Sequence, residues 1–132
     1  MSPPATGGLP TEPVNRETML FTIVIATCNR PDRLAAALQA VARAVAASGR
    51  RHRVLVVDNG DTHPAHDAVE RSTQETGLSV RHLRSIPRNK SAALNLGIRE
   101  AETEWLAFTD DDTLADTAWL RCAETFLEEN DM

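Results

Sequence analysis

Short apolar runs alternate with longer stretches of mixed polarity from about residue 20 to residue 130. A nearly continuous apolar run of four to eight residues is typical of a strand that is buried on both faces. The stretches between the runs have turn signals at their ends and helical spacing inside. We predict strands at 20–26, 54–57, 78–83 and 105–108, and helices at 31–48, at about 64–76, after 89, and from about 116.

Three of the predicted helices have apolar residues spaced three or four positions apart, so that these residues share one face. The helix at about 64–76 is more polar, and Gly77 follows its end. The positions predicted to face the core are Leu34, Leu38, Val41 and Val45 in the first helix, Leu94, Ile98 and Ala101 in the third, and Leu120, Ala123 and Leu127 in the last.

Strands that alternate with helices at this spacing predict right-handed βαβ units and a parallel sheet, hence an α/β fold of Rossmann-like type with helices on both faces. In open sheets of this kind, ligands bind beyond the carboxyl ends of the strands. One α/β domain is expected at 19–132. Residues 1–18, which are rich in Pro and Gly, are expected to form a disordered leader.

Composition excludes several classes of protein. The formal net charge is -5, which argues against nucleic acid as a partner because phosphate backbones require a basic surface. The two cysteines, Cys28 and Cys122, form no CxxC pair, so a reduced, cytoplasmic setting is expected. No apolar run approaches the roughly 18 residues that a membrane span needs.

The acidic triplet Asp110-Asp111-Asp112 follows the fourth predicted strand. In an extended segment Asp110 and Asp112 point to the same side and Asp111 to the other. Paired carboxylates of this kind suit Mg²⁺ or Mn²⁺, whose coordination is completed by waters and phosphates. The alternative is a solvated turn that caps the last helix.

Polar residues also follow the first two predicted strands. Thr27, Asn29 and Arg30 could contact a base and a phosphate, or could form a turn in which Asn29 or Asp32 caps the helix. Asp58 could accept a hydrogen bond from a nucleobase N–H, or could form a turn with the two residues that follow it.

Basic residues flank the start of the third predicted helix. Arg88 and Lys90 lie where the free N–H groups of a helix already favour anions, so that a diphosphate site is one interpretation and a solvated basic turn is the other. A metal cluster of His63 and His66 with nearby aspartates is the weaker interpretation of that segment, because no second pair of ligands matches it.

Four segments together resemble the family 2 glycosyltransferases. Residues 22–31 resemble the opening strand and loop of that family, and 54–61 its second strand. Residues 89–98 resemble its phosphate-side helix, and 105–112 the strand that leads into its DxD motif. The resemblance covers about residues 20 to 130, and four ordered motifs are more specific than any one of them.

The resemblance implies a GT-A fold in which the first and fourth strands are neighbours, with a nucleotide-diphosphate sugar as ligand and Mg²⁺ or Mn²⁺ as cofactor. It implies that Asp58 contacts the base. Asp112 becomes the first candidate for the metal, and Asp110 spans ribose and metal. Asp111 is a further candidate, because the register of the triplet is open. The residues implied on the nucleotide side are Thr27, Asn29, Arg30 and Lys90.

Two departures from the family pattern shape the functional expectation. Ser91 stands where relatives usually have Gly, and the sequence stops about twenty residues after the DxD segment. We therefore expect a GT-A domain truncated after the DxD region, which lacks the acceptor half and the general base and associates with a missing C-terminal half or through an exposed sheet edge. Asp116 and Glu124 have the charge that a general base requires, but no other feature of the sequence assigns that role to either of them. The alternative is a non-catalytic nucleotide-binding or interaction module.

Overall fold

A computed structural model of the chain describes residues 19–60, 65–85 and 89–130. The expected leader at 1–18 lies outside these residues, as do His63 and Arg88. Within them the predicted alternation of strands and helices is confirmed. The elements are β1 Met19–Thr27, α2 Pro31–Ser48, β2 Arg51–Asp58, α3 His66–Thr76, β3 Val80–Arg84, α4 Lys90–Glu100, β4 Trp105–Asp110 and α5 Trp119–Glu129.

The four strands form one parallel sheet in the order β3-β2-β1-β4. The chain therefore builds outward from β1 through β2 to β3 and then crosses back to place β4 on the other side of β1. Ala26 is in register with Asp110 of β4, and Thr27 with Asp58 of β2. The prediction that the first and fourth strands are neighbours is confirmed, and this reversal of strand order marks the binding edge of such sheets.

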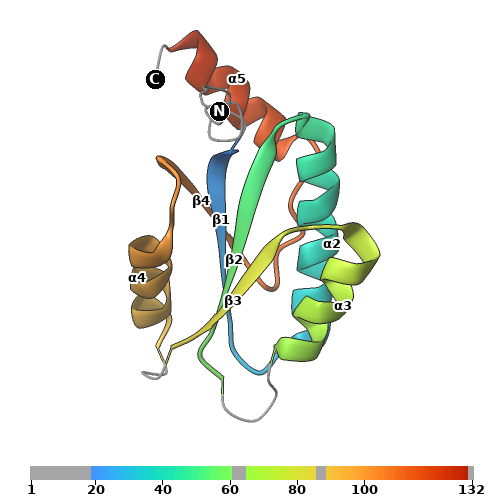
Figure 1. Cartoon of the computed structure of the whole chain (residues 1–132), viewed down its shortest axis with the longest axis vertical. Coiled ribbons are helices and arrows are strands. Elements are labelled where there is room, and N and C mark those ends of the chain that lie inside the picture. The colour runs from blue at the N-terminus through green and yellow to red at the C-terminus, as the bar shows by residue number, and fades with distance from the viewer. Residues whose placement is uncertain (1–18, 61–64, 86–88, 131–132) are drawn as a thin grey trace, which may run out of the picture.

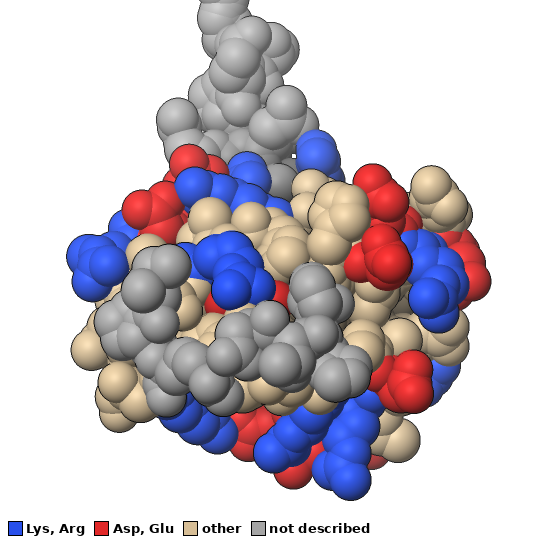
Figure 2. Space-filling model, turned by 90° about the horizontal axis from the view of Figure 1, so that it is seen from below, with Lys and Arg blue, Asp and Glu red and all other residues tan. Residues whose placement is uncertain are grey.

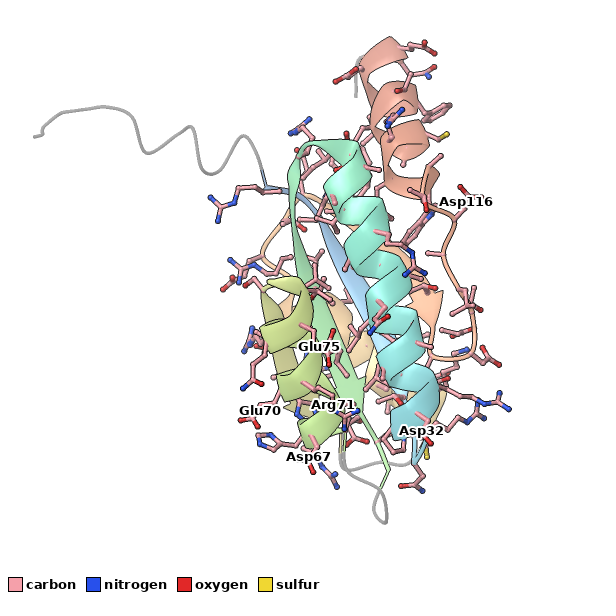
Figure 3. The ribbon with its side chains drawn as sticks, turned by 90° about the vertical axis from the view of Figure 1, so that its right-hand side faces the viewer. Asp32, Asp67, Glu70, Arg71, Glu75 and Asp116 are labelled. Carbon is pink, nitrogen blue, oxygen red and sulfur yellow. The ribbon has the colours of Figure 1, made fainter. Side chains whose placement is uncertain are left out.

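Helices cover both faces of the sheet, as predicted. Figure 1 shows α4 on one side of the strands and α2 and α3 on the other, and Figure 3 shows α2 and α3 side by side on their shared face. Alternate residues of β1 enter different cores: Ile23 and Ile25 pack on the α2 side, and Val24 on the α4 side. Because both faces are buried, the strands appear in the sequence as nearly continuous apolar runs.

The predicted inner face of α4 is right for Leu94, which packs against the core, but wrong for Ile98; the predicted faces of α2 and α5 agree with the structure. The buried residues of α4 are Ala93 and Gly97, while Ile98 is 48% exposed. A Cβ added at Gly97 would lie 2.7 Å from Cγ1 of Val24. The close approach of helix and sheet thus selects the smallest residues, and a pattern based on large apolar side chains missed them.

A buried hydrogen-bonded pair joins α5 to the amino-terminal end of the sheet. His52 Nε2 lies 2.8 Å from Glu124 Oε2, and the backbone N–H of Phe21 donates to His52 Nδ1 at 3.3 Å. Because Nδ1 accepts this bond, the ring is neutral and carries its proton on Nε2. Burial, which outweighs the attraction of Glu124, holds the pKa of His52 below its usual value.

Large apolar side chains are exposed in β4 and in the segments that follow it. β4 is an edge strand of the described sheet, and Phe108, Leu114 and Phe126 are exposed. No helix within the described residues is long and apolar enough to cross a membrane.

Replacing Gly97 with Ala should lower the free energy of unfolding by about 1 kcal/mol. Overpacking against Val24 costs about 1–3 kcal/mol, which exceeds the roughly 1 kcal/mol that Ala gains over Gly in a helix. Denaturant titration measures the difference. Ile98→Ala, on the exposed side of the same helix, is the control and should have a smaller effect, whereas a more stable Gly97→Ala variant would contradict the packing described above.

Stability should decline as the pH falls below about 6.5, the ordinary pKa of histidine. The pKa values of His52 and His82 are both lowered by burial, so the unfolded chain binds more protons than the folded chain in this range. His52→Gln keeps an N–H donor but does not titrate, and should flatten the pH dependence measured by thermal unfolding. An unchanged slope in His52→Gln would refute the assignment.

Candidate functional site

A polar cleft lies at the carboxyl ends of β1 and β4, beside the amino-terminal end of α4. Its volume is about 340 Å³. Figure 2, which views the molecule from below and so from the carboxyl ends of the strands, shows basic and acidic side chains interspersed on this face. The residues that line the cleft are Ala26, Thr27, Cys28, Arg30, Asn59, Asn89, Lys90, Asp110, Asp111 and Asp112.

The acidic triplet is not wholly extended, as the prediction assumed, although Asp111 and the pair Asp110 and Asp112 differ in exposure as expected. β4 ends at Asp110, and a turn follows in which the backbone N–H of Thr113 donates to the Asp110 carbonyl at 3.3 Å. The turn directs Asp111 inward, where it is buried, and leaves the side chains of Asp110 and Asp112 about half exposed. Asp110 and Asp112 therefore keep oxygens that are accessible from the cleft.

Asp111 ties the end of β4 to the loop after β1. Thr27 Oγ1 donates to Asp111 Oδ2 at 2.9 Å, and Arg30 Nη1 lies 3.4 Å from Asp111 Oδ1. The same guanidinium nitrogen lies 3.8 Å from Asp112 Oδ2. The short Thr27 bond fixes the inward carboxylate, so the structure brings three predicted site residues together across more than eighty positions of sequence.

Lys90 reaches the triplet from the start of α4. Its Nζ lies 2.7 Å from Asp110 Oδ1, and the hydrogen bond and charge of that carboxylate raise the pKa of Lys90. Asn89 is the N-cap residue, and its side chain accepts a hydrogen bond from the backbone N–H of Ala92 at 2.7 Å. The role of Asn89 was not predicted, although an Asn just before a helix is a recognised capping signal.

The loop after β1 has a conformation that depends on a glycine in the neighbouring loop. Asn29 has a φ of 57°, in the left-handed region where Asn is among the tolerated residues. A Cβ at Gly60 would collide with the Asn29 side chain and would lie 2.7 Å from its backbone N. The N-cap residue of α2 is Arg30, whose side chain forms no capping bond, so the alternative in which Asn29 or Asp32 is the cap residue does not match the structure.

Asp58 does not line the cleft. It is fully buried, and its carboxylate accepts hydrogen bonds from the backbone N–H groups of Gly60 at 2.8 Å and Ala65 at 3.1 Å. This is the turn geometry that the sequence left open as the alternative to base binding. The next residue, Asn59, lines the cleft instead and was not predicted. The sequence could have marked Asn59 as a site residue, because it directly follows a predicted strand and a predicted site residue.

The two residues considered as replacements for a general base lie away from the cleft. Glu124 pairs with His52, and Asp116 Oδ1 accepts a hydrogen bond from the backbone N–H of Ala118 at 2.8 Å. Figure 3 shows Asp116 beside the start of α5, in the half of the molecule away from the carboxyl ends of the strands. Neither residue can contact a ligand in the cleft as the structure stands.

A second group of potential metal ligands lies on the exposed surface of α3. His66, Asp67 and Glu70 are all exposed, and their ligand atoms lie within 4.8 Å of one another. Exposed side chains on one helical turn often approach each other without a metal. The group lies outside the cleft.

The cleft has a donor set that fits a hard divalent cation. Its three carboxylates supply the oxygen ligands that Mg²⁺ and Mn²⁺ prefer. Each carboxylate has a cationic group within 4 Å, either Lys90 or Arg30, as expected where negative charge accumulates. Asp110 and Asp112, with half-exposed side chains, are the pair best placed to hold such an ion.

Comparison with known proteins agrees with this geometry. The model of glycosyl transferase family 2 matches residues 22–132. No curated protein matches the chain at a significant level. A crystal structure of S. aureus TarS 1-349 matches with a TM-score of 0.72 at 22% identity, over 84% of this chain and 33% of that one.

Two further structures were determined with ligands. The S. aureus TarS 1-349 complex with UDP-GlcNAc matches with a TM-score of 0.64 at 24% identity, over 84% of this chain and 32% of that one. The mannosyltransferase PcManGT from Pyrobaculum calidifontis, in complex with GDP-Man and Mn²⁺, matches with a TM-score of 0.69 at 25% identity, over 81% and 32%. The fold is thus GT-A, and the chain spans about a third of the length of these structures.

Replacing Gly60 with Ala should lower the free energy of unfolding by about 1–3 kcal/mol, because the new methyl group cannot fit against the loop at Asn29. Thermal or denaturant unfolding measures the loss. The double variant Asn29→Gly/Gly60→Ala should recover part of it, because the side-chain collision is removed while the backbone contact remains. Wild-type stability in Gly60→Ala would show that the two loops do not constrain each other.

Proposed function

The chain belongs to glycosyl transferase family 2, and from this premise we propose that it binds the nucleotide-diphosphate sugar donor of a glycosyl transfer reaction in the cleft at the ends of β1 and β4. The acceptor and the sugar are left open by this proposal. It concerns the donor side of the reaction, because the chain spans about a third of the matched structures.

The observation that carries the proposal is the convergence of charged groups from three separate segments on one cleft. Arg30 comes from the loop after β1, Lys90 from the start of α4, and the acidic triplet from the end of β4. A diphosphate needs cationic partners, and a divalent cation needs carboxylates. Both kinds of group are present within contact distance of each other.

In the proposed complex, the diphosphate lies against Lys90 and the amino-terminal end of α4, whose free N–H groups favour anions. Thr27 and Arg30 hold Asp111, and Arg30 is also available to the nucleotide. Asp110 and Asp112 would hold Mg²⁺ or Mn²⁺. When bound, the ion neutralises charge on the diphosphate and so favours departure of the nucleotide.

The acceptor hydroxyl must lose its proton as it attacks the anomeric carbon of the sugar. Asp116 and Glu124 are engaged elsewhere, so we assign this proton transfer to a polypeptide segment beyond the described residues. The exposed side chains of Phe108 and Leu114 beside the β4 edge offer such a segment an apolar surface. Support for a nucleotide-sugar ligand also comes from the structures of TarS with UDP-GlcNAc and of PcManGT with GDP-Man and Mn²⁺.

Calorimetric titration with UDP, GDP and dTDP, each with and without Mn²⁺, tests the proposal. We expect at least one nucleotide to bind in a metal-dependent manner. Asp112→Asn should weaken that binding at least about tenfold in the presence of Mn²⁺. Mutation of residues that only hydrogen-bond to metal ligands already changes metal affinity by about that factor. Asp67→Asn, which makes the same change on exposed α3, is the matched control. Equal affinity of Asp112→Asn and wild type with Mn²⁺ would remove Asp112 from the metal site.

A further inference from the structure

A second polar cleft lies between α2 and α3, on the face of the sheet opposite α4. We call it the α2–α3 cleft. Its volume is about 160 Å³, and Figure 3 looks onto these two helices, with Arg71 and Glu75 of α3 labelled. The residues that line it are Ala35, Gln39, Ala68, Arg71, Ser72 and Glu75. It shares no lining residue with the cleft at the ends of β1 and β4, so the two are separate.

The hydroxyl of Ser72 is a buried polar group in the wall of this cleft. Ser72 is 3% exposed, and its Oγ has no hydrogen-bond partner among the described residues. A hydroxyl inside a helix usually bonds to the carbonyl four positions earlier. Its neighbours do so: Thr73 Oγ1 donates to the Val69 carbonyl at 3.0 Å, and Thr76 Oγ1 to the Ser72 carbonyl at 2.6 Å. Ser72 lacks this bond, so its hydroxyl is free to donate to a ligand.

Arg71 is a cationic side chain without an ionic partner among the described residues. Asp67 and Glu75 stand four positions before and after it, a spacing at which helical ion pairs form. Neither of them pairs with it. Glu75 instead accepts a hydrogen bond from Gln39 Nε2 of α2 at 3.3 Å. The guanidinium at the mouth of the cleft is therefore available to an anion.

We propose that the α2–α3 cleft binds the carboxylate of a small organic acid or amino acid. The two oxygens of a carboxylate match the planar fork of the Arg71 guanidinium. The Ser72 hydroxyl then gains the acceptor that the described residues do not supply, and a buried polar group of this kind is normally paired. This site is independent of the donor site proposed above.

The lining of the cleft favours a carboxylate over a phosphate. It combines the cationic Arg71 with the anionic Glu75, and the second charge repels a phosphate dianion more than a carboxylate. Ala35 and Ala68 add a small apolar surface for a carbon skeleton. The volume lies well below the roughly 300 Å³ at which sites for drug-sized ligands begin, so the ligand must be small. Glu75 could also pair with the ammonium group of an amino acid.

Titration of the ¹⁵N-labelled full chain, followed by NMR at constant ionic strength, tests the proposal with acetate, glycine and inorganic phosphate as probes. We expect acetate to shift the backbone amide signals of Gln39 and Ser72 in a saturable manner. Because these signals are specific to single residues, they separate this site from anion binding near Lys90. Tighter binding of glycine than of acetate identifies an amino acid as the ligand class, and equal or weaker binding identifies an organic acid.

Two variants and one control define the roles of the side chains. Arg71→Gln should weaken acetate binding at least about tenfold, the factor expected for loss of a charge-assisted hydrogen bond. Arg99→Gln makes the same change at an exposed position of α4 and should bind acetate as the wild type does. Ser72→Ala should weaken acetate binding about threefold, as for one neutral hydrogen bond. It should not lower the midpoint of thermal unfolding, because the hydroxyl that it removes is unpaired.

Three results would overturn the proposal. Amide shifts that rise linearly with acetate would show that no site is being filled, and equal affinity of Arg71→Gln and wild type would remove the cationic partner. Tighter binding of phosphate than of acetate at the same amides would contradict the assignment to a carboxylate. A lower unfolding midpoint in Ser72→Ala with unchanged acetate binding would remove the hydroxyl from the site.

Discussion

The burial of β1 on both faces and along both edges is the constraint on which the rest of the structure depends. Its apolar residues face two separate cores, so helices must cover the sheet on both sides. Its two edges pair with β2 and β4, which are far apart in sequence. The carboxyl ends of these three strands therefore meet, and the polar residues that follow each strand form a single cleft.

Charge compensation sets the geometry of that cleft. Three consecutive aspartates would repel one another strongly, and the fold answers by directing Asp111 toward Thr27 and Arg30 and by pairing Asp110 with Lys90. The two cationic groups that now stabilise the carboxylates are also the groups that a diphosphate would attract. A bound nucleotide and cation would thus exchange ionic partners within a site that is already organised.

One end of the sheet is closed by α5, whereas the edge at β4 carries exposed apolar side chains. Toward the amino-terminal ends of the strands, the buried pair of His52 and Glu124 joins α5 to β2. Beside β4, by contrast, Phe108 and Leu114 remain exposed next to an edge strand. An exposed edge with apolar residues is a surface on which further chain can pack.

The sequence by itself determined the order of strands and helices, the parallel sheet and the edge at which the polar residues gather, because apolar periodicity and strand ends are local features of the chain. It also identified Thr27, Arg30, Lys90 and the triplet as neighbours through the family resemblance. Only the tertiary structure decided which aspartate is buried, that Gly97 rather than Ile98 faces the sheet, and that Asn59 rather than Asp58 opens into the cleft. These outcomes depend on turns and on contacts between distant segments, whose geometry is set by packing and hydrogen bonding and has no counterpart in local sequence spacing.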